Sequence, residues 1–324
     1  MDNVCHSLAG AAIAHTGFAR RLPRATLLAI IAANIPDVDA FTYLGADRAF
    51  AVSFRRGWTH GIPALIVWAV ALAVAFALWQ RRRPRSAAGA HAAASWQSYL
   101  PLAAISVVSH PALDWLNNYG VRFFMPFSDE WFYGDALFIV DPALIALFGL
   151  GWWASSQMLK AGSHRAELAA RTALALALIY VATMKTMSVA TLGAARRAAG
   201  VNDTSPQGAM VAPTPFSLTR RELFVRRPES GAAPSYDAYP ATWTAHGAEI
   251  GARESHESSG DVPAVRAAVL ATKDGERFLR WSRFPYFMPG TGADSGTIFV
   301  GDARYSSGAS EGWAGIRVRV RGPR

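Results

Sequence analysis

Long apolar stretches separated by short polar ones fill the first 195 residues of the chain. Residues 61–79 carry no charged side chain and, at about 1.5 Å per residue, are long enough to cross a hydrocarbon core. Five more stretches are apolar but interrupted by a few polar side chains: 4–18, 25–44, 99–116, 136–154 and 168–192. The pattern predicts a mainly α fold, a polytopic membrane bundle of about five to six helices.

The pattern changes after residue 195. Prolines become frequent and no long apolar run follows. Residues 297–300 and 315–321 instead alternate in the manner of strands. We therefore expect two domains: a membrane-embedded helical domain over 1–195 and a small, mainly β extramembrane domain over 196–324.

Composition and charge support a membrane location. The chain is 52% apolar and 17% charged, whereas soluble domains carry about 25% charged residues. The net charge of +9 comes largely from arginines between apolar runs, as in cytoplasmic loops of membrane proteins, and no nucleic-acid-binding motif accompanies it. We expect a multi-pass protein of the bacterial inner membrane that binds no nucleic acid.

The arginine clusters also predict an orientation. If each stretch crosses once, three clusters share one face, which the positive-inside rule makes cytoplasmic: Arg20/Arg21/Arg24, Arg81/Arg82/Arg83/Arg85 and Lys160/Arg165/Arg171. The C-terminal domain then lies in the periplasm. Arg48, Arg55 and Arg56 fall on the outer face, against the rule.

Polar residues inside the apolar stretches are the candidate chemistry. A carboxylate at the bilayer centre costs at least ~2.5–3.5 kcal/mol, so such residues usually line an interior site. Under the predicted topology they converge near the outer ends of separate helices: His6, Asp37, Asp39, His60, His110, Asp114, Asp135 and Asp141. The sequence therefore predicts a common polar site at one depth of the membrane.

Local spacing favours metal ligation. His110 and Asp114 are four residues apart, which places them on one helical face, although Pro111 disfavours α geometry at His110. We expect Thr59 to cap a helix with His60 in its first turn. Imidazoles and carboxylates suit zinc first, with manganese or iron as alternatives, and the single cysteine excludes a thiolate site and an internal disulfide.

Each residue taken alone also has an ordinary structural explanation. His6 could be a hydrogen-bonded helix histidine and His60 a loop residue. Asp37 and Asp39 could form a cap or a surface turn. For Asp135 and Asp141 a structural role, such as starting a helix at Pro142, is as probable as a functional one. The metal prediction rests on the set.

The order of these motifs resembles that of a known family. The motifs are HSLAG at 6–10, NIPDVD at 34–39, RGWTH at 56–60, HPALDWLN at 110–117, WFYGD at 131–135 and Asp141-Pro142. Residues 1–155 in particular resemble the YdjM/YbcI-like, LexA-regulated inner-membrane proteins, which are described as metal-dependent hydrolases. The resemblance implies a divalent-metal site and hydrolytic activity.

A more distant likeness suggests roles for individual residues. The order Asp39, His60, then His110 and Asp114 is similar to that of the zinc-dependent phospholipases C. It implies that His60, His110 and Asp114 bind metal and that Asp39 orients or deprotonates the attacking water. No later His-x-x-x-Glu pair stands on the outer face, which implies one or two metals instead of three.

The leading hypothesis is a hydrolase of phosphoesters or esters, with a lipid or small molecule as substrate. His6, Asp37, Asp39, His60, His110 and Asp114 are its metal-ligand candidates, and Asp39, Asp135 and Asp141 its catalytic candidates. Two alternatives remain open: an ion or solute transporter or channel lined by the acidic residues, and a structural membrane protein braced by the metal. The sequence does not identify a protein partner of the C-terminal domain.

Overall fold

A computed structural model describes residues 1–45, 47–82, 95–198, 208–226, 236–256, 262–305 and 314–320. They form two compact units, which are described separately: Met1–Asp39 with Arg56–Lys185, and Ala40–Arg55 with Thr186–Arg324. The predicted boundary after residue 195 falls within the long helix α9 (Ala166–Ala198). Arg83, Arg85 and Arg321 of the predicted patterns lie outside the described residues.

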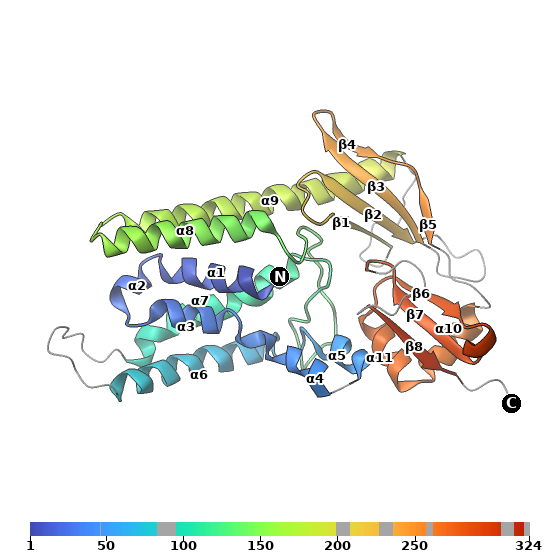
Figure 1. Ribbon diagram of the computed structural model, residues 1–324, viewed down its shortest axis with the longest axis horizontal. Helices are drawn as coiled ribbons and strands as arrows, with labels where there is room; N and C mark the ends of the chain where they lie inside the picture. The colour runs from blue at the N-terminus through green and yellow to red at the C-terminus, as the bar shows by residue number, and fades with distance from the viewer. Residues whose placement is uncertain are drawn as a thin grey trace. The chain divides into compact units, whose positions relative to one another are not determined.

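The first unit is helical. Its elements are α1 (Asn3–Ala14), α2 (Phe18–Arg21), α3 (Ala25–Ala32), the 3₁₀ helix η1 (Ile35–Phe41), α6 (Ile62–Arg81), α7 (Trp96–Trp115), α8 (Pro142–Lys160) and most of α9. The long helices lie side by side with nearly parallel axes (Figure 1). Helix α1 packs against α3, α7 and α8, and α6 packs against α7.

Two helices of the described chain are long and apolar enough to cross a membrane: Ile62–Arg81 and Ala166–Arg197. A third span is possible if the bent pair Ala25–Ala32 and Ile35–Gly45 counts as one, with a bend of 45°. Helices α7 and α8 have 20 and 19 residues and are long enough, but their polar side chains make their mean hydropathy lower than that of the two candidate spans. The predicted helical N-terminal region is confirmed, whereas five to six spans remain a prediction.

The second unit contains two antiparallel sheets. The first has β1 (Ala209–Pro213), β2 (Arg220–Arg226), β3 (Tyr236–Thr244) and β4 (Gly247–Ile250) in that order, with β5 (Glu254–His256) also paired to β3. The second orders β6 (Pro285–Pro289), β7 (Thr297–Asp302) and β8 (Gly315–Arg319). The predicted strand at 297–300 is confirmed as part of β7, and the one at 315–321 is confirmed over 315–319 as β8.

Helices complete the second unit: α4 (Thr42–Gly45), α5 (Arg48–Phe54), α10 (Val262–Leu270), α11 (Lys273–Trp281) and the 3₁₀ helix η2 (Gly292–Asp294). The two sheets share one aromatic core, which includes Phe224, Tyr236, Phe284 and Phe299. Asp302 is fully buried beside it. Burial alone would raise the pKa of this carboxyl, but the Arg304 guanidinium, 2.8 Å away, and the hydrogen bonds around it hold the pKa below its usual range.

The helices that position the site cross closely at Gly10. A Cβ atom at Gly10 of α1 would lie 2.5 Å from the carbonyl oxygen of Ala29 in α3, a separation that real Cβ atoms do not adopt. Gly149 of α8 also packs against α1, but a Cβ atom there would lie 3.5 Å from Leu8 Cδ1, an ordinary contact. Of these two glycines of α1 and α8, packing therefore requires Gly10 but not Gly149.

We predict that Gly10→Ala destabilises the protein by about 1–3 kcal/mol, the usual cost of overpacking. Gly149→Ala is the matched control and should leave stability unchanged or raise it, because alanine favours a helix over glycine by about 0.8–1.0 kcal/mol. The measurement is the thermal unfolding midpoint of each variant in detergent. Equal midpoints for the two variants would contradict the close α1–α3 crossing.

Candidate metal centre

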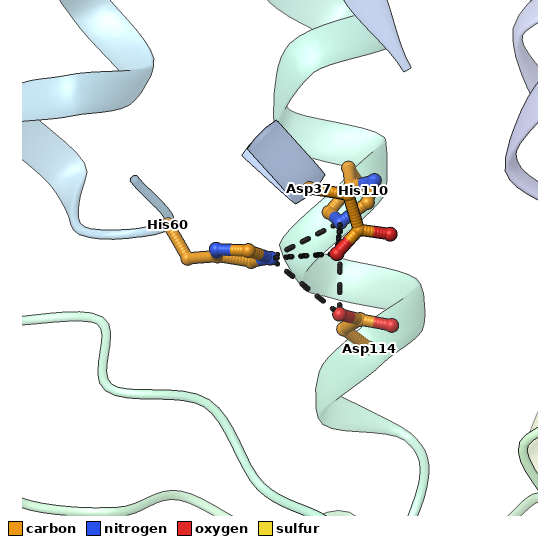
Figure 2. A group of neighbouring side chains, drawn as sticks. All are labelled: Asp37, His60, His110 and Asp114. Atoms are coloured by element: carbon orange, nitrogen blue, oxygen red, sulfur yellow. Dashed lines mark hydrogen bonds and ion pairs between the residues drawn. The ribbon is translucent and has the colours of Figure 1, made fainter. Parts of the chain in front are cut away.

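Four side chains from three separate segments meet inside the first unit (Figure 2). Asp37 comes from η1, His60 from the turn before α6, and His110 and Asp114 from α7. Each offers one ligand atom, and all four atoms lie within 4.8 Å of one another. His60, His110 and Asp114 have no exposed surface, and the Asp37 side chain is 9% exposed.

The separations match a tetrahedral ion site. His60 Nε2 lies 3.1 Å from His110 Nε2, and both nitrogens lie 3.6 Å from Asp114 Oδ2. Asp37 Oδ1 lies 3.9 Å from His60 Nε2 and 3.7 Å from His110 Nε2. Zinc binds such ligands at about 2.0–2.2 Å, which corresponds to tetrahedron edges of about 3.3–3.6 Å. The donor set therefore fits a divalent ion.

Hydrogen bonds on the far side of each imidazole fix its tautomer. His110 Nδ1 lies 2.6 Å from the carbonyl oxygen of Ala33, which can only accept. His60 Nδ1 lies 2.9 Å from Thr59 Oγ1 and 3.3 Å from Asp39 Oδ2, and the Thr59 hydroxyl itself donates to that oxygen. Both Nδ1 atoms therefore carry the proton, and both Nε2 lone pairs face the centre.

The facing lone pairs demand a cation. Two unprotonated nitrogens 3.1 Å apart are both acceptors and repel each other. Nearby are the Oδ2 of Asp114 and the Oδ1 of Asp37, which add negative charge. A cation at the centre, a metal ion or a proton, removes this repulsion, and the four-donor geometry suits a metal ion.

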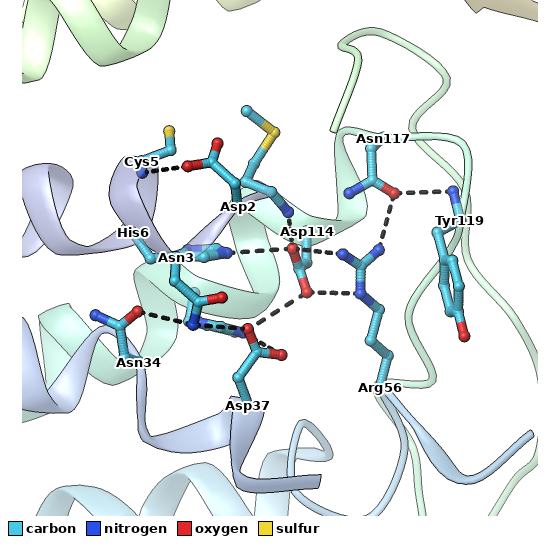
Figure 3. Close-up of polar contacts among 12 residues, drawn as sticks. Asp2, Asn3, Cys5, His6, Asn34, Asp37, Arg56, Asp114, Asn117 and Tyr119 are labelled. Atoms are coloured by element: carbon cyan, nitrogen blue, oxygen red, sulfur yellow. Dashed lines mark hydrogen bonds and ion pairs between the residues drawn. The ribbon is translucent and has the colours of Figure 1, made fainter. Parts of the chain in front are cut away.

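A buried arginine supports Asp114 from behind (Figure 3). Arg56 Nη2 donates to Asp114 Oδ1 at 3.0 Å, and its Nε lies 2.8 Å from Oδ2. The same guanidinium donates to Asn117 Oδ1 at 2.9 Å and lies over the ring of Tyr119. The Met1 amino group also contacts Asp114 Oδ1. These positive groups offset the cost of burying the carboxylate.

The opposite edge of the centre is polar and accessible. Asn3 Nδ2 donates to Asp37 Oδ2 at 3.3 Å and to Asn34 Oδ1 at 3.2 Å. Asn34 in turn donates to Ser7 Oγ at 3.0 Å. Asn3 is exposed and its neighbours are partly exposed, so this rim is where water reaches the partly exposed ligand Asp37.

Two of the predicted ligands lie next to the four-donor group but do not join it. His6 is buried with its ring stacked on His110 at 3.8 Å, and its Nε2 lies 3.3 Å from Asp114 Oδ1. Asp39 is also buried and accepts from the Arg56 backbone N–H at 2.8 Å. Its contact with His60 Nδ1 places it behind the imidazole, opposite the ligand atom.

Asp135 and Asp141, the other catalytic candidates, lie outside the group. Asp141 caps α8, because its Oδ1 accepts from the Leu144 N–H at 3.0 Å and its Oδ2 from the Tyr180 hydroxyl at 2.9 Å. Asp135 has a positive φ of 50° and follows Gly134, whose N–H donates to the last residue of α7. The structure thus gives Asp141 a helix-starting contact and brings neither residue to the four donors.

The predicted local structure of His60 is wrong in one respect. Thr59 does not cap a helix: α6 begins at Ile62 with Gly61 as its N-cap, and His60 lies in the preceding turn, with its N–H donating to Gly57 O. The Thr59 hydroxyl contacts Asp39 instead. Pro111, in contrast, is accommodated inside α7, so the predicted His110–Asp114 pairing on one face is retained.

Sequence reasoning gave no role to Arg56, Asn3 or Asn117, although two of them stand in the quoted motifs. The available signal was Arg56, an arginine on the outer face against the positive-inside rule. The hydrogen bond from Arg56 to the buried Asp114 carboxylate explains why an arginine lies at this position.

The Asp39→Asn substitution tests the orienting role of Asp39. We predict that metal affinity falls about 10–100-fold, the usual loss when a ligand's hydrogen-bond partner is removed. The control is Asp129→Asn, a half-exposed carboxylate paired with Arg122. The measurement is a titration against a chelator of known affinity. Unchanged affinity would contradict the orienting role, and complete loss would make Asp39 a ligand itself.

The residues around the centre fall within the part of the chain that matches a known family. The profile of the family described as YdjM inner membrane protein matches residues 1–189, more than half of the chain and all of the residues around the centre. Comparison with curated proteins and with solved structures gives no match.

Proposed function

The chain belongs to the YdjM inner membrane protein family, and on that premise we propose that it is a membrane-bound, metal-dependent hydrolase of phosphoesters or esters. One observation carries the proposal: the four donors are two imidazoles and two carboxylates, with no thiolate. Structural zinc sites are typically built from cysteines, whereas sets of histidine with aspartate or glutamate are typical of catalytic sites. Zinc is the first candidate ion, with manganese or iron as alternatives.

Asp37, His60, His110 and Asp114 are the residues that would hold the ion. A divalent ion there would polarise the scissile bond and supply a water whose pKa is near ~7. The chain's own groups then have separate tasks. Asp39 and the Ala33 carbonyl keep the imidazoles in the ligating tautomer, and Arg56 keeps Asp114 ionised and in place.

The accessible rim suits substrate approach. Asn3 and Asn34 present amide groups beside Asp37, the one partly exposed ligand. Asn3 already donates to Asn34 and Asp37, and Asn34 to Ser7 and the Ile30 carbonyl, so an oxygen of a phosphoester or ester would replace one of these hydrogen bonds. His6, whose Nε2 lies 3.3 Å from Asp114 Oδ1, is a further imidazole beside the centre that would accept or return a proton. Hydrolysis would break the ester bond with water as the second reactant.

A second candidate is a structural metal that braces the helices. It is favoured by the number of donors, because four protein ligands fill the tetrahedral positions of zinc, whereas catalytic zinc keeps one open. Catalysis with all four donors would need a fifth position or an ion of higher coordination number. Removal of the ion separates the two functions: a brace is needed for folding, and a catalytic ion for turnover.

We predict that His60→Ala and His110→Ala each abolish metal binding. His15→Ala is the matched control, because His15 is a buried histidine of the same unit whose ring contacts Ser155 instead of the centre. Metal content of the detergent-purified protein is measured by mass spectrometry. Full metal occupancy in His60→Ala and His110→Ala would refute the ligand assignment.

Activity is measured on the same samples with a soluble phosphodiester and with a lipid panel. We expect hydrolysis that is lost on chelation and restored by metal, while the helical circular-dichroism signal persists. Unfolding on chelation, with no hydrolysis by the loaded protein, would favour the brace.

The orientation follows as a separate proposal. The family and the apolar helices support an inner-membrane location, and the arginine clusters favour a periplasmic C-terminal unit. A reporter fused after Arg85 should give a cytoplasmic signal and one fused after Arg324 a periplasmic signal. The reverse pair of signals would overturn this orientation.

A further inference from the structure

An apolar groove runs along the outer surface of the first unit between α6 and α7. Its volume is about 560 Å³, within the range of about 300–1,000 Å³ that is typical of ligand pockets. Residues from Ile62 to Ala69 of α6 and from Ala104 to Trp115 of α7 form its walls, and Phe123 and Phe132 close one end. The groove opens outward, since Ile66 and Val108 are 62% and 51% exposed.

The walls carry no charged side chain, and the Trp115 indole N–H is their one side-chain donor. Helix α6 is one of the two described helices apolar enough to cross a membrane, and if it does, the groove would face hydrocarbon. A hydrocarbon chain is the occupant that such a surface accepts without burying an unsatisfied polar group.

The α7 wall of the groove is about as long as one leaflet is thick, whereas the α6 wall, from Ile62 to Ala69, rises about 10 Å. From Ala104 to Trp115 an α-helix rises about 16 Å, at 1.5 Å per residue, and half of a hydrocarbon core is about 15 Å thick. The α6 wall begins at the first residue of that helix, Ile62. The groove therefore extends from the end of the span to about its middle, as one acyl chain of a lipid does.

The closed end of the groove lies at the depth of the four donors. Ile62 follows His60 by two residues, Trp115 is next to Asp114, and Pro111 is next to His110. The Ile62 N–H donates to the Phe123 carbonyl at 2.9 Å, which fixes the closing loop to this end of α6. A chain in the groove brings its headgroup to the end of the bundle that holds the candidate metal centre.

We propose that this groove seats one acyl chain of a bilayer phospholipid, and that the substrate of the hydrolase is the ester-bearing headgroup of that lipid. The identity of the substrate rests on the proposed function, whereas binding of the acyl chain in the groove does not. One face of α7 carries the ligand candidates His110 and Asp114, which point inward. Another face, with Val108 and Trp115, lines the groove.

The test uses the full-length protein in vesicles of phosphatidylethanolamine and phosphatidylglycerol, doped with phosphatidylglycerol that carries a diazirine in one acyl chain. After irradiation, mass spectrometry maps the adducts. We expect residues 62–69 and 104–115 to be labelled at least three-fold above Leu176, Leu178 and Ile179, which are comparably exposed apolar residues of α9. Equal labelling of the two sets would overturn the proposal that the groove binds an acyl chain.

Two matched pairs of variants complete the test. Ala104→Trp fills the groove and should reduce its labelling at least five-fold, whereas Ala71→Trp, at an exposed α6 position outside the groove, should not. Ile66→Asn and Val67→Asn form the second pair, because both residues are 62% exposed and only Ile66 lines the groove. Unchanged labelling in Ala104→Trp and Ile66→Asn would overturn the inference.

Activity separates this inference from the proposed function. Ala104→Trp should retain bound metal and hydrolysis of a soluble phosphodiester but lose at least five-fold in hydrolysis of the lipid. Equal loss on both substrates would overturn the lipid assignment. If the groove is still labelled but the protein hydrolyses neither substrate, acyl-chain binding in the groove is supported and the proposed hydrolase function is refuted.

Discussion

Two imidazole nitrogens that face each other in the interior are the constraint on which the helical unit depends. His60 and His110 come from different segments, and their Nε2 atoms lie 3.1 Å apart where no solvent reaches. Two unprotonated acceptors at that distance repel each other, and a cation between them, a metal ion or a proton, would remove the repulsion. The surrounding contacts serve this pair: Ala33 and Asp39 hold the protons on the far nitrogens, and two carboxylates supply the countercharge for the cation.

From the sequence, the helical first unit and the meeting of Asp37, His60, His110 and Asp114 could be predicted, whereas Asp135 and Asp141 were wrongly placed in the same group. Spacing alone placed His110 and Asp114 on one face, because a helix repeats every 3.6 residues, and apolar length identified α6. The roles of individual side chains could not be predicted, since they depend on partners distant in sequence. Asp39 is a possible ligand by its motif, but it contacts the back of His60, and Asp141 caps α8. Periodicity carries no information on such contacts.

Arg56 shows how a local electrostatic need can override a topological rule. Counted as a loop charge, it conflicts with an outer position under the positive-inside rule. Arg56 is 3% exposed, and its guanidinium pairs with Asp114 and Asn117. A buried arginine paired in this way says nothing about the side of the membrane on which the loop lies. Arg48 and Arg55 belong to the second unit, so the orientation argument depends on the remaining clusters.

The position of the centre at one end of the bundle limits how any lipid could react there. Helix α7 presents its ligands to the interior and its apolar residues to the groove, so the helix itself separates hydrocarbon from the ion. If the groove holds an acyl chain, the ester group of that lipid would have to pass over the end of the helices, where the Asn3–Asn34–Asp37 rim is accessible. Hydrocarbon and water then meet the centre from different sides. The proposed hydrolysis of a membrane lipid would use this separation, because the substrate would stay in the bilayer while water would come from the aqueous phase.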